Sequence, residues 1–140
     1  MGNLTFTMIK PDAVRANKTA AILKHLADAG FRIVALRMHR MKREQAERFY
    51  AVHAGKPFFE PLVEFMTSGP VVAAVLEKEN AVPELRKTVG ATDPAEAAEG
   101  TVRRLYGTSK QQNAIHASDS DDNARYEWAI HFEEGEVFVG

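Results

Sequence analysis

The chain has 140 residues, of which 45% are hydrophobic, and this size and composition fit one compact domain spanning residues 1–140. Eighteen Lys and Arg residues against nineteen Asp and Glu residues leave a formal net charge of −1. This excludes recruitment of nucleic acid or anionic lipid by a net positive charge of the whole protein. The chain has no cysteine, so disulfides, thiolate metal ligands and thiol nucleophiles are excluded as well.

The sequence predicts neither a secretory signal nor a membrane span. The first ten residues lack the apolar length of a signal peptide, and no run of about 18 apolar residues occurs that would cross a bilayer. We therefore expect a soluble protein with no membrane partner. Its expected compartment is the cytoplasm, and the lack of cysteine agrees with reducing surroundings.

Three elements are predicted in the first 41 residues. Apolar residues alternate with threonines over residues 4–8, which is typical of a half-buried strand, and Pro11 ends this strand because proline cannot donate to a ladder. Apolar residues recur at helical spacing over residues 19–29, where Gly30 can close a helix. Residues 31–41 follow as a second strand.

The middle of the chain predicts a helical pair and a buried strand. Residues 42–53 have helical spacing, and Pro57 can open a second helix that ends at residues 68–69. The unbroken apolar run of residues 71–76 is typical of a strand buried on both faces at the centre of a sheet. Asn80 can cap the short helix that follows.

The last third of the chain is less regular. Residues 90–112 lose periodicity and are rich in Gly, Pro, Thr and Ala, so we expect a functional loop that carries ligand groups. Residues 120–122 indicate an acidic helix start, yet apolar side chains alternate over residues 126–132 as in a strand, which leaves this segment ambiguous. The element order predicts an α+β sandwich, of which the ferredoxin-like βαββαβ arrangement, an antiparallel sheet with covering helices, is the simplest member.

The segment Asn113-Ala-Ile-His116-Ala-Ser118-Asp119 sets one histidine among short polar residues. An imidazole nitrogen is a competent nucleophile near neutral pH, and its phosphorylated form can pass the group on. Such a histidine needs its second ring nitrogen fixed, for which Glu127 is a candidate, although a glutamate is more often a helix-surface carboxylate. The other histidines, which we expect to be solvated or partly packed, are His25, His39, His53 and His131.

Phosphoryl transfer depends mainly on positioning and on positive charge near the phosphates. Lys10, Arg86 and Arg103 are candidate cations, but nothing local in the sequence distinguishes Arg103 from Arg104. Neither common glycine-rich phosphate loop occurs in the chain, so side chains must hold the phosphates.

The arrangement Asn-x-x-His-x-Ser-Asp, with Glu127 further on, closely resembles the nucleoside diphosphate kinase signature, and the resemblance covers nearly the whole chain. It implies a ping-pong phosphotransferase, in which a nucleoside triphosphate phosphorylates His116 and a nucleoside diphosphate then collects the group. It also implies that Glu127 bonds the imidazole, that Ser118 bonds Glu127, and that Tyr50 lies beside the transferred phosphate.

The resemblance further implies where the nucleotide binds. The residues that match sugar and phosphate contacts are Lys10, Arg86, Thr92, Arg103 and Asn113. The base would lie against Phe58 and Leu62, although simple helix packing is the alternative role for both. Stacking is indifferent to base identity, and a pair such as Lys10 and Asn113 reads the sugar, so broad base tolerance is expected.

Magnesium and a homo-oligomer are also expected from the resemblance. Mg²⁺ in such sites keeps several waters and is held largely by substrate phosphates, so Asp119 is its expected protein contact, through water. The alternative for Asp119 is a solvated helix N-terminus. The family assembles as tetramers or hexamers built from dimers, and apolar side chains in residues 135–140 suggest contact with a neighbouring subunit.

The chain departs from the family pattern at two positions. Ala117 replaces the usual glycine after the histidine, so the backbone there must have a negative φ or carry some strain. Lys110 stands where many members place a small apolar residue over the base, and its aliphatic stem can serve the same purpose. The second departure concerns base affinity and not catalysis.

Two other functions share parts of this pattern. A non-catalytic ferredoxin-like module would bind nucleotides or single-stranded nucleic acid through Phe58 and the basic side chains. The slightly negative charge, and strands without paired exposed aromatics, argue against nucleic acid as the main partner. A phosphatase would pass the phosphate from His116 to water, but the chain lacks the Arg-His-Gly motif of histidine phosphatases.

Overall fold

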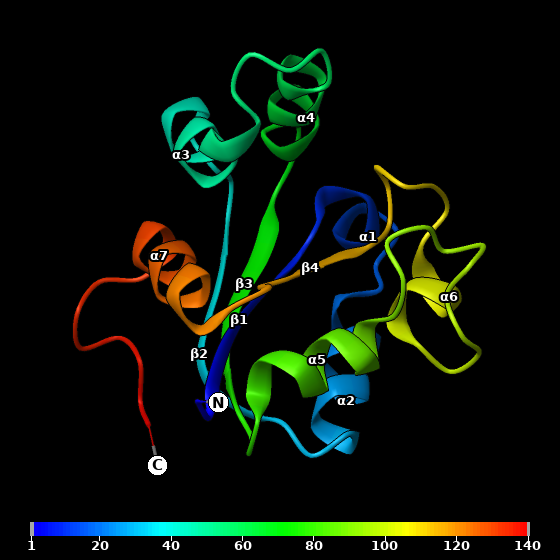
Figure 1. Cartoon of the computed structure of the whole chain (residues 1–140), viewed down its shortest axis with the longest axis vertical. Coiled ribbons are helices and arrows are strands. Elements are labelled where there is room, and N and C mark those ends of the chain that lie inside the picture. Colours follow the sequence, from blue (N-terminus) through cyan, green and yellow to red (C-terminus); the bar gives the residue numbers. More distant parts are fainter. Residues whose placement is uncertain (1, 140) are drawn as a thin grey trace.

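The computed structural model describes residues 2–139, which form one antiparallel sheet with helices around it (Figure 1). Within this range the four strands are β1 (Leu4–Ile9), β2 (Arg32–His39), β3 (Val71–Glu77) and β4 (Ile115–Ala117). Their spatial order is β2-β3-β1-β4, and every neighbouring pair is antiparallel. This is the α+β, ferredoxin-like architecture that the element order predicts.

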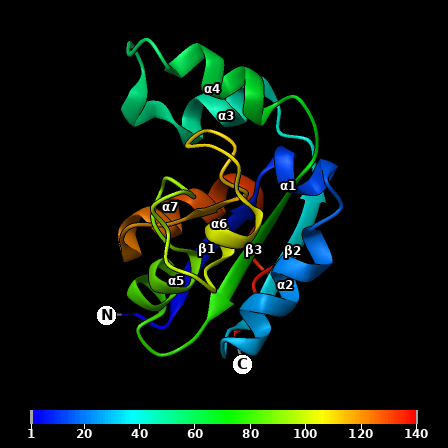
Figure 2. The ribbon, with the colours of Figure 1, turned by 90° about the vertical axis from the view of Figure 1, so that its right-hand side faces the viewer.

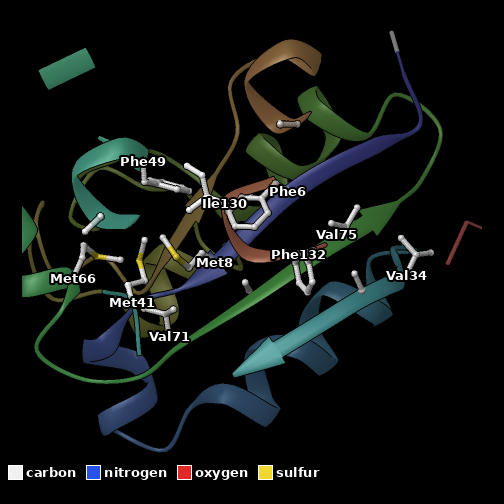
Figure 3. Packing of buried hydrophobic residues seen from close by; sticks show 14 of the residues in the cluster. Phe6, Met8, Val34, Met41, Phe49, Met66, Val71, Val75, Ile130 and Phe132 are labelled. Atoms are coloured by element: carbon white, nitrogen blue, oxygen red, sulfur yellow. The ribbon is translucent and has the colours of Figure 1, made fainter. Parts of the chain in front are cut away.

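Helices cover both faces of the sheet (Figure 1 and Figure 2). They are α1 (Pro11–Arg15), α2 (Thr19–Asp28), α3 (Arg43–Phe49), the 3-10 helix η1 (Ala51–His53), α4 (Phe59–Met66), α5 (Ala81–Val89), α6 (Val102–Tyr106) and α7 (Asp121–His131). One core joins α3, α4 and α7 to the face that carries Phe6 and Met8 (Figure 3). A second core joins α1, α2, α5 and α6 to the face that carries Ile9 and Leu76. None of the helices within residues 2–139 has the length and hydrophobicity to cross a bilayer.

Because both faces are covered, β1 is not the half-buried strand that its alternation predicts. Thr5 and Thr7 are as inaccessible as Phe6 and Met8, all four at 0% exposure. The hydroxyl of Thr7 donates to the carbonyl of His116 at 2.7 Å, so a buried polar group helps tie β1 to β4.

Most predicted elements are present, and some have different bounds. The helix expected over residues 42–53 divides into α3 and η1, and the helix expected from Pro57 begins at Phe59. Asn80 occupies the N-cap position of α5, but its side chain makes no capping bond. Its backbone is left-handed, with φ 54°, whereas a capping side chain normally requires an extended backbone.

The ambiguous segment after residue 120 is the helix α7, which contradicts the strand alternative. Ser120 caps the helix, because its Oγ accepts from the amide of Asn123 at 3.1 Å, and the first turn is acidic. The apolar alternation is misleading because Tyr126 is 50% exposed on the helix surface, while Phe132 is buried just beyond the helix end.

His131 is part of the core, contrary to the expectation of a solvated or partly packed ring. It is 1% exposed, and its ring stacks on Phe6 with centroids 5.1 Å apart. Its Nδ1 shares a 2.8 Å hydrogen bond with Nε2 of His39 on β2. This imidazole pair therefore joins the end of α7 to the edge of the sheet.

Candidate active site

His116 lies on β4, the three-residue strand at one edge of the sheet, where it pairs with Met8. Such a short strand leaves no alternation to detect in the sequence. A tight turn precedes it: Ala114 has φ 74°, and the amide of Ile115 donates to the carbonyl of Asn113 at 2.9 Å. The turn and the strand together fix the backbone from which the imidazole projects.

A carboxylate from α7 holds the imidazole of His116. Nε2 of His116 donates to Oε1 of Glu127 at 2.9 Å, and the hydroxyl of Ser118 donates to the same oxygen. The side chains of His116 and Glu127 are 22% and 12% exposed, so water competes little for this contact. Because Nε2 is occupied, Nδ1 is the ring nitrogen left for chemistry.

Aromatic side chains pack against the same ring. Phe49 of α3 meets His116 edge-on, with centroids 5.0 Å apart and an interplanar angle of 73°, and Phe6 lies 6.2 Å away. Tyr50 packs against Phe49 and lines the cavity beside His116. Burial and the negative charge of Glu127 raise the pKa of Tyr50, so its hydroxyl stays protonated and can donate a hydrogen bond.

A cavity of about 260 Å³ opens beside the imidazole, between η1, α5, β4 and α7. Besides His116 and Glu127, the predicted site residues that line it are Tyr50, Arg86, Thr92, Arg103 and Asp119. It brings together groups from segments far apart in the sequence, and its polar surface suits an anionic ligand.

Two arginines give the cavity its positive charge. Arg86 donates to the carbonyl of Ala117 at 3.3 Å, and Arg103 donates to the carbonyls of Gly90 and Ile115 at 3.0 and 2.9 Å. Burial and the nearby charge of Arg86 lower the pKa of Arg103 to about 10, so the guanidinium of Arg103 remains charged at neutral pH. Ala117 is extended within β4 and has no positive φ, so alanine fits here without left-handed strain.

Lys10 and Asn113 meet at the junction between β1 and the loop before β4. The ammonium of Lys10 donates to Oδ1 of Asn113 at 3.0 Å and to the carbonyl of Gln111 at 2.7 Å. Asn113 in turn donates to the carbonyl of Thr92 at 3.0 Å. Burial lowers the pKa of Lys10 to about 8, an effect that Asp12 opposes and Arg103 reinforces.

A second hollow, of about 320 Å³, lies between α4 and the loop before β4. It is lined by Phe58, Leu62, Lys110 and Lys10, among others. Phe58 is 48% exposed and so presents its ring to solvent, whereas Leu62 is partly buried and also packs against the core. The hollow is wide and apolar enough to accept a planar ring.

Comparison with known proteins identifies the family. Residues 3–137 match the family of nucleoside diphosphate kinases. The chain belongs to this family. A nucleoside diphosphate kinase from Phenylobacterium zucineum is 54% identical over 98% of this chain and 99% of its own length. One from Flavobacterium psychrophilum is 51% identical over 97% of this chain and 98% of its own length.

Solved nucleoside diphosphate kinases have the same fold. The enzyme from Aquifex aeolicus superposes with a TM-score of 0.93 at 46% identity, covering 96% of this chain and 98% of that one. The enzyme from Halobacterium salinarum in complex with CDP superposes with a TM-score of 0.94 at 39% identity. This match covers 100% of this chain and 93% of that one. As a nucleoside diphosphate kinase, the chain is a nucleotide-binding enzyme that transfers terminal phosphate between nucleotides by way of a phosphohistidine and uses a divalent cation.

Asp119 is the predicted metal contact of this nucleoside diphosphate kinase. It is exposed at the cavity, where its Oδ1 accepts a hydrogen bond from the side-chain Nδ2 of Asn123 at 2.6 Å. Residues 2–139 contain no cluster of three or more histidine, aspartate or glutamate side chains that would enclose a metal ion. The solvent-exposed carboxylate of Asp119 at the cavity suits a cation that keeps several of its own waters.

Two features of the site are not evident in the sequence. The fold separates the neighbouring arginines: Arg103 lines the cavity, whereas Arg104 is exposed and donates to the carbonyl of Ala95 at 3.0 Å. His53, expected to be solvated or partly packed, lines the cavity with His116. Its sequence neighbours give no signal of this position, which depends on how η1 is set against the sheet.

Proposed function

We propose that this enzyme accepts phosphate on Nδ1 of His116 and passes it to a second nucleotide. The observation that carries the proposal is the hydrogen bond from Nε2 of His116 to Glu127, which leaves the lone pair of Nδ1 as the nucleophile. Ser118 supports this arrangement by holding the Glu127 carboxylate. Glu127 thus serves as a positioning residue and as a counter-charge for the ring.

Nδ1 attacks the terminal phosphorus of a nucleoside triphosphate. The bond from phosphorus to the bridging oxygen breaks, and its electron pair leaves with the nucleoside diphosphate. Arg86 and Arg103 stabilise the negative charge on the transferred group, and Glu127 stabilises the positive charge that develops on the imidazole. A second diphosphate reverses these steps, and because like anhydrides are exchanged the reaction is nearly isoergic.

The remaining site residues bind the nucleotide. Tyr50 and Thr92 line the cavity of His116 and offer hydroxyl donors to phosphate oxygens. Lys10 and Asn113 form one hydrogen-bonded unit that we assign to the sugar and the adjoining phosphate.

The hollow beside α4 is the proposed base site, where the base stacks on Phe58 and lies against Leu62. The stem of Lys110 covers the other side. Stacking tolerates all bases, so we expect broad nucleotide specificity. The proposed substrates are nucleoside di- and triphosphates, and the proposed compartment is the cytoplasm.

Mg²⁺ is the proposed divalent cation, held by the substrate phosphates and by Asp119 through water. When bound, it would neutralise charge on the phosphate oxygens. An Asp119→Asn variant should need more Mg²⁺ for half-maximal rate while its rate at saturating Mg²⁺ stays close to that of the wild type. An unchanged Mg²⁺ requirement would remove Asp119 from the site.

A homodimer through the edge of β2 is the proposed unit of a tetramer or hexamer. Leu36 and Met38 on this edge strand are 51% and 59% exposed, and Phe138 beside it is 71% exposed. The backbone amide of Phe138 donates to the carbonyl of Val34 at 2.7 Å, which holds this terminal segment against β2. Both residues line a hollow of about 680 Å³. Of the apolar segment expected at residues 135–140, Gly140 lies outside the described residues.

Light scattering tests the proposed homodimer. It should report an oligomer for the wild type and a smaller species for Leu36→Asp. A wild-type monomer would contradict the proposal.

Labelling with ATP tests the proposed chemistry directly. ATP labelled at its terminal phosphate should give an acid-labile phosphoprotein, and unlabelled nucleoside diphosphate should remove the label. A His116→Ala variant should give neither result, whereas His25→Ala, on the surface of α2, should behave as wild type. Phosphate exchange by His116→Ala would overturn the proposal, and rapid phosphate release without an acceptor would favour a phosphatase.

A further inference from the structure

The hydrogen-bonded pair of His39 and His131 lies one helical turn from the carboxylate that holds His116. His131 and Glu127 are four residues apart on α7, so their side chains project from the same face of the helix. Two contacts join this last turn to β2: Nδ1 of His131 shares a 2.8 Å hydrogen bond with His39, and the carbonyl of His131 accepts from Arg37 at 2.9 Å. The position of Glu127 therefore depends on contacts at the edge of the sheet opposite β4.

Two phenylalanine rings connect this pair to the catalytic imidazole. His131 stacks on Phe6 and meets Phe49 edge-on, with ring centroids 5.1 and 5.6 Å away. Both phenylalanines also pack on His116, and their own centroids lie 5.8 Å apart (Figure 3). Because a protein core is close-packed, a shift of His131 would move the rings around His116 as well as the helix that carries Glu127.

One arrangement of protons suits the histidine pair. The ring of His131 is 1% exposed, and its Nε2 is buried without a hydrogen-bond partner within residues 2–139. A proton on this Nε2 would be a buried donor without an acceptor, which is costly, so the neutral ring carries its proton on Nδ1. Nδ1–H of His131 then donates to Nε2 of His39. The proton of the partly exposed His39 is on its own Nδ1, where water can accept it.

We propose that His131 and His39 are positioning residues, whose neutral hydrogen bond sets α7 so that Glu127 meets Nε2 of His116. This inference rests on the proposed function, in which the bond from His116 to Glu127 directs Nδ1 at phosphorus. Apolar packing alone would hold α7 against the sheet, but such contacts are not directional and leave the helix freer to slide or turn. A hydrogen bond between two rings has a preferred length and angle, and so fixes the last turn of α7.

Loss of this bond should slow phosphoryl transfer and leave nucleotide affinity almost unchanged. Of residues 2–139, those that line the His116 cavity and the base hollow do not include His39 or His131. His131→Phe keeps an aromatic ring against Phe6 and removes the bond. A misplacement of about 1 Å in a catalytic group can cost about 100-fold in rate, so a partial loss of order should lower the single-turnover rate of His116 phosphorylation by about tenfold. The ATP concentration at half-maximal rate should stay within about twofold of the wild type.

Two variants of His39 separate the hydrogen bond from the packing. The side-chain oxygen of His39→Gln can accept from Nδ1–H of His131, so this variant should keep most of the wild-type rate. His39→Leu fills similar space without an acceptor and should be as slow as His131→Phe. Ile22→Val, in the core on the opposite face of the sheet, controls for general stability: urea unfolding should show it folded but less stable, with an unchanged rate.

Nitrogen-15 NMR of the imidazole rings gives a second readout. The wild-type spectrum should show His131 as the Nδ1–H tautomer and His116 as the Nε2–H tautomer, bonded to the carboxylate. In His131→Phe and His39→Leu the His116 signals should move toward those of a free imidazole that exchanges its tautomers, whereas Ile22→Val should leave them in place.

A wild-type rate in both His131→Phe and His39→Leu would overturn the inference, as would equal losses in the Gln and Leu variants of His39. An Nε2–H tautomer of His131 would also overturn it. Phosphoenzyme formation by the wild type is followed in parallel. If the wild type forms no phosphohistidine, the proposed function fails; if phosphohistidine forms at a rate that does not depend on the pair, only the positioning role fails.

Discussion

The two ring nitrogens of His116 differ in their contacts, because individual neighbouring residues fix the orientation of the ring. Glu127 occupies Nε2, and Phe49 packs edge-on against the ring, so a turn of the ring that exchanges its nitrogens would lose both contacts. Such a fixed orientation keeps the same lone pair available in every catalytic cycle. The orientation therefore depends on α3 and α7 together.

Removing the carboxylate should lower the rate of transfer and not the affinity for nucleotide. We expect Glu127→Ala to reduce kcat by about 100-fold, because the ring loses both its orientation and its counter-charge, while KM stays within about threefold. Steady-state kinetics would measure both parameters. A variant that retained half of the wild-type kcat would show that the hydrogen bond is dispensable.

Lys10 should give the enzyme an alkaline limit. Burial lowers the pKa of Lys10 to about 8, so the ammonium loses its proton, and its charge for phosphate binding, as the pH rises through that value. The ratio kcat/KM, which reports on the free enzyme, should therefore fall between pH 7 and pH 9. The side chain in Lys10→Arg stays charged over this pH range. This variant should have a lower kcat/KM at neutral pH, but its kcat/KM should not fall between pH 7 and pH 9. An equal fall in kcat/KM would assign the alkaline limit to another group.

At the scale of elements, the sequence predicts long regular segments and misses short ones. The apolar spacing of α2 and the unbroken run of β3 are visible because several side chains repeat. β4 and α1 have too few residues for a period to appear, and Ala114 gives no sign of its left-handed turn.

The candidate site is recognised from the sequence mainly through the family signature. The segment from Asn113 to Asp119 and Glu127 are recognisable by type and spacing, but the choice of Arg103 over Arg104 depends on the direction in which α6 turns each side chain. Likewise, His53 enters the cavity because of the turn at η1. Orientation within a helix packed on distant strands cannot be read from neighbouring residues alone.

The structure gives a definite expectation for Ala117→Gly, which restores the usual family residue. Ala117 is extended in β4 and 6% exposed, so glycine gains nothing from its wider backbone range and loses a buried methyl group. Unfolding in urea should show a loss of about 0.5–1 kcal/mol, with kcat within about twofold of the wild type. A more stable glycine variant would mean that the strand at residue 117 is strained.

At the scale of the whole molecule, the core between the sheet and α7 contains a histidine pair where apolar contacts would suffice. The ring of His131 packs against Phe6 and Phe49. Within residues 2–139, this ring has one hydrogen-bonded partner, His39. The backbone carbonyl of His131 accepts from Arg37 at 2.9 Å, which places a fixed positive charge nearby. The pair is therefore stable only while it is not fully protonated.

Acid should consequently weaken the fold. Burial, and then the charges of His39, His116 and Arg37, lower the pKa of His131 to about 3, from 6.5 for a free imidazole. Between these values the unfolded chain binds a proton that the native chain does not, so the free energy of unfolding falls as the pH drops below 6.5. At 1.36 kcal/mol per pH unit, this group alone accounts for a loss of about 2 kcal/mol by pH 5.

Urea unfolding at pH 7 and pH 5 would measure the effect. His131→Phe keeps an aromatic ring against Phe6 and should show a clearly smaller loss of stability between the two pH values than the wild type. The opposite result, an equal loss in both proteins, would assign the acid sensitivity to other groups.

Residues 40–70, between β2 and β3, form a single excursion of the chain away from the sheet. His39 and Val71, at the ends of these strands, pair directly, so residues 40–70 leave the sheet and return to it at one point (Figure 2). The excursion carries Tyr50 of the His116 cavity as well as Phe58 and Leu62 of the proposed base site. One continuous segment thus serves both hollows, so a displacement of residues 40–70 would move the two ends of a bound nucleotide together.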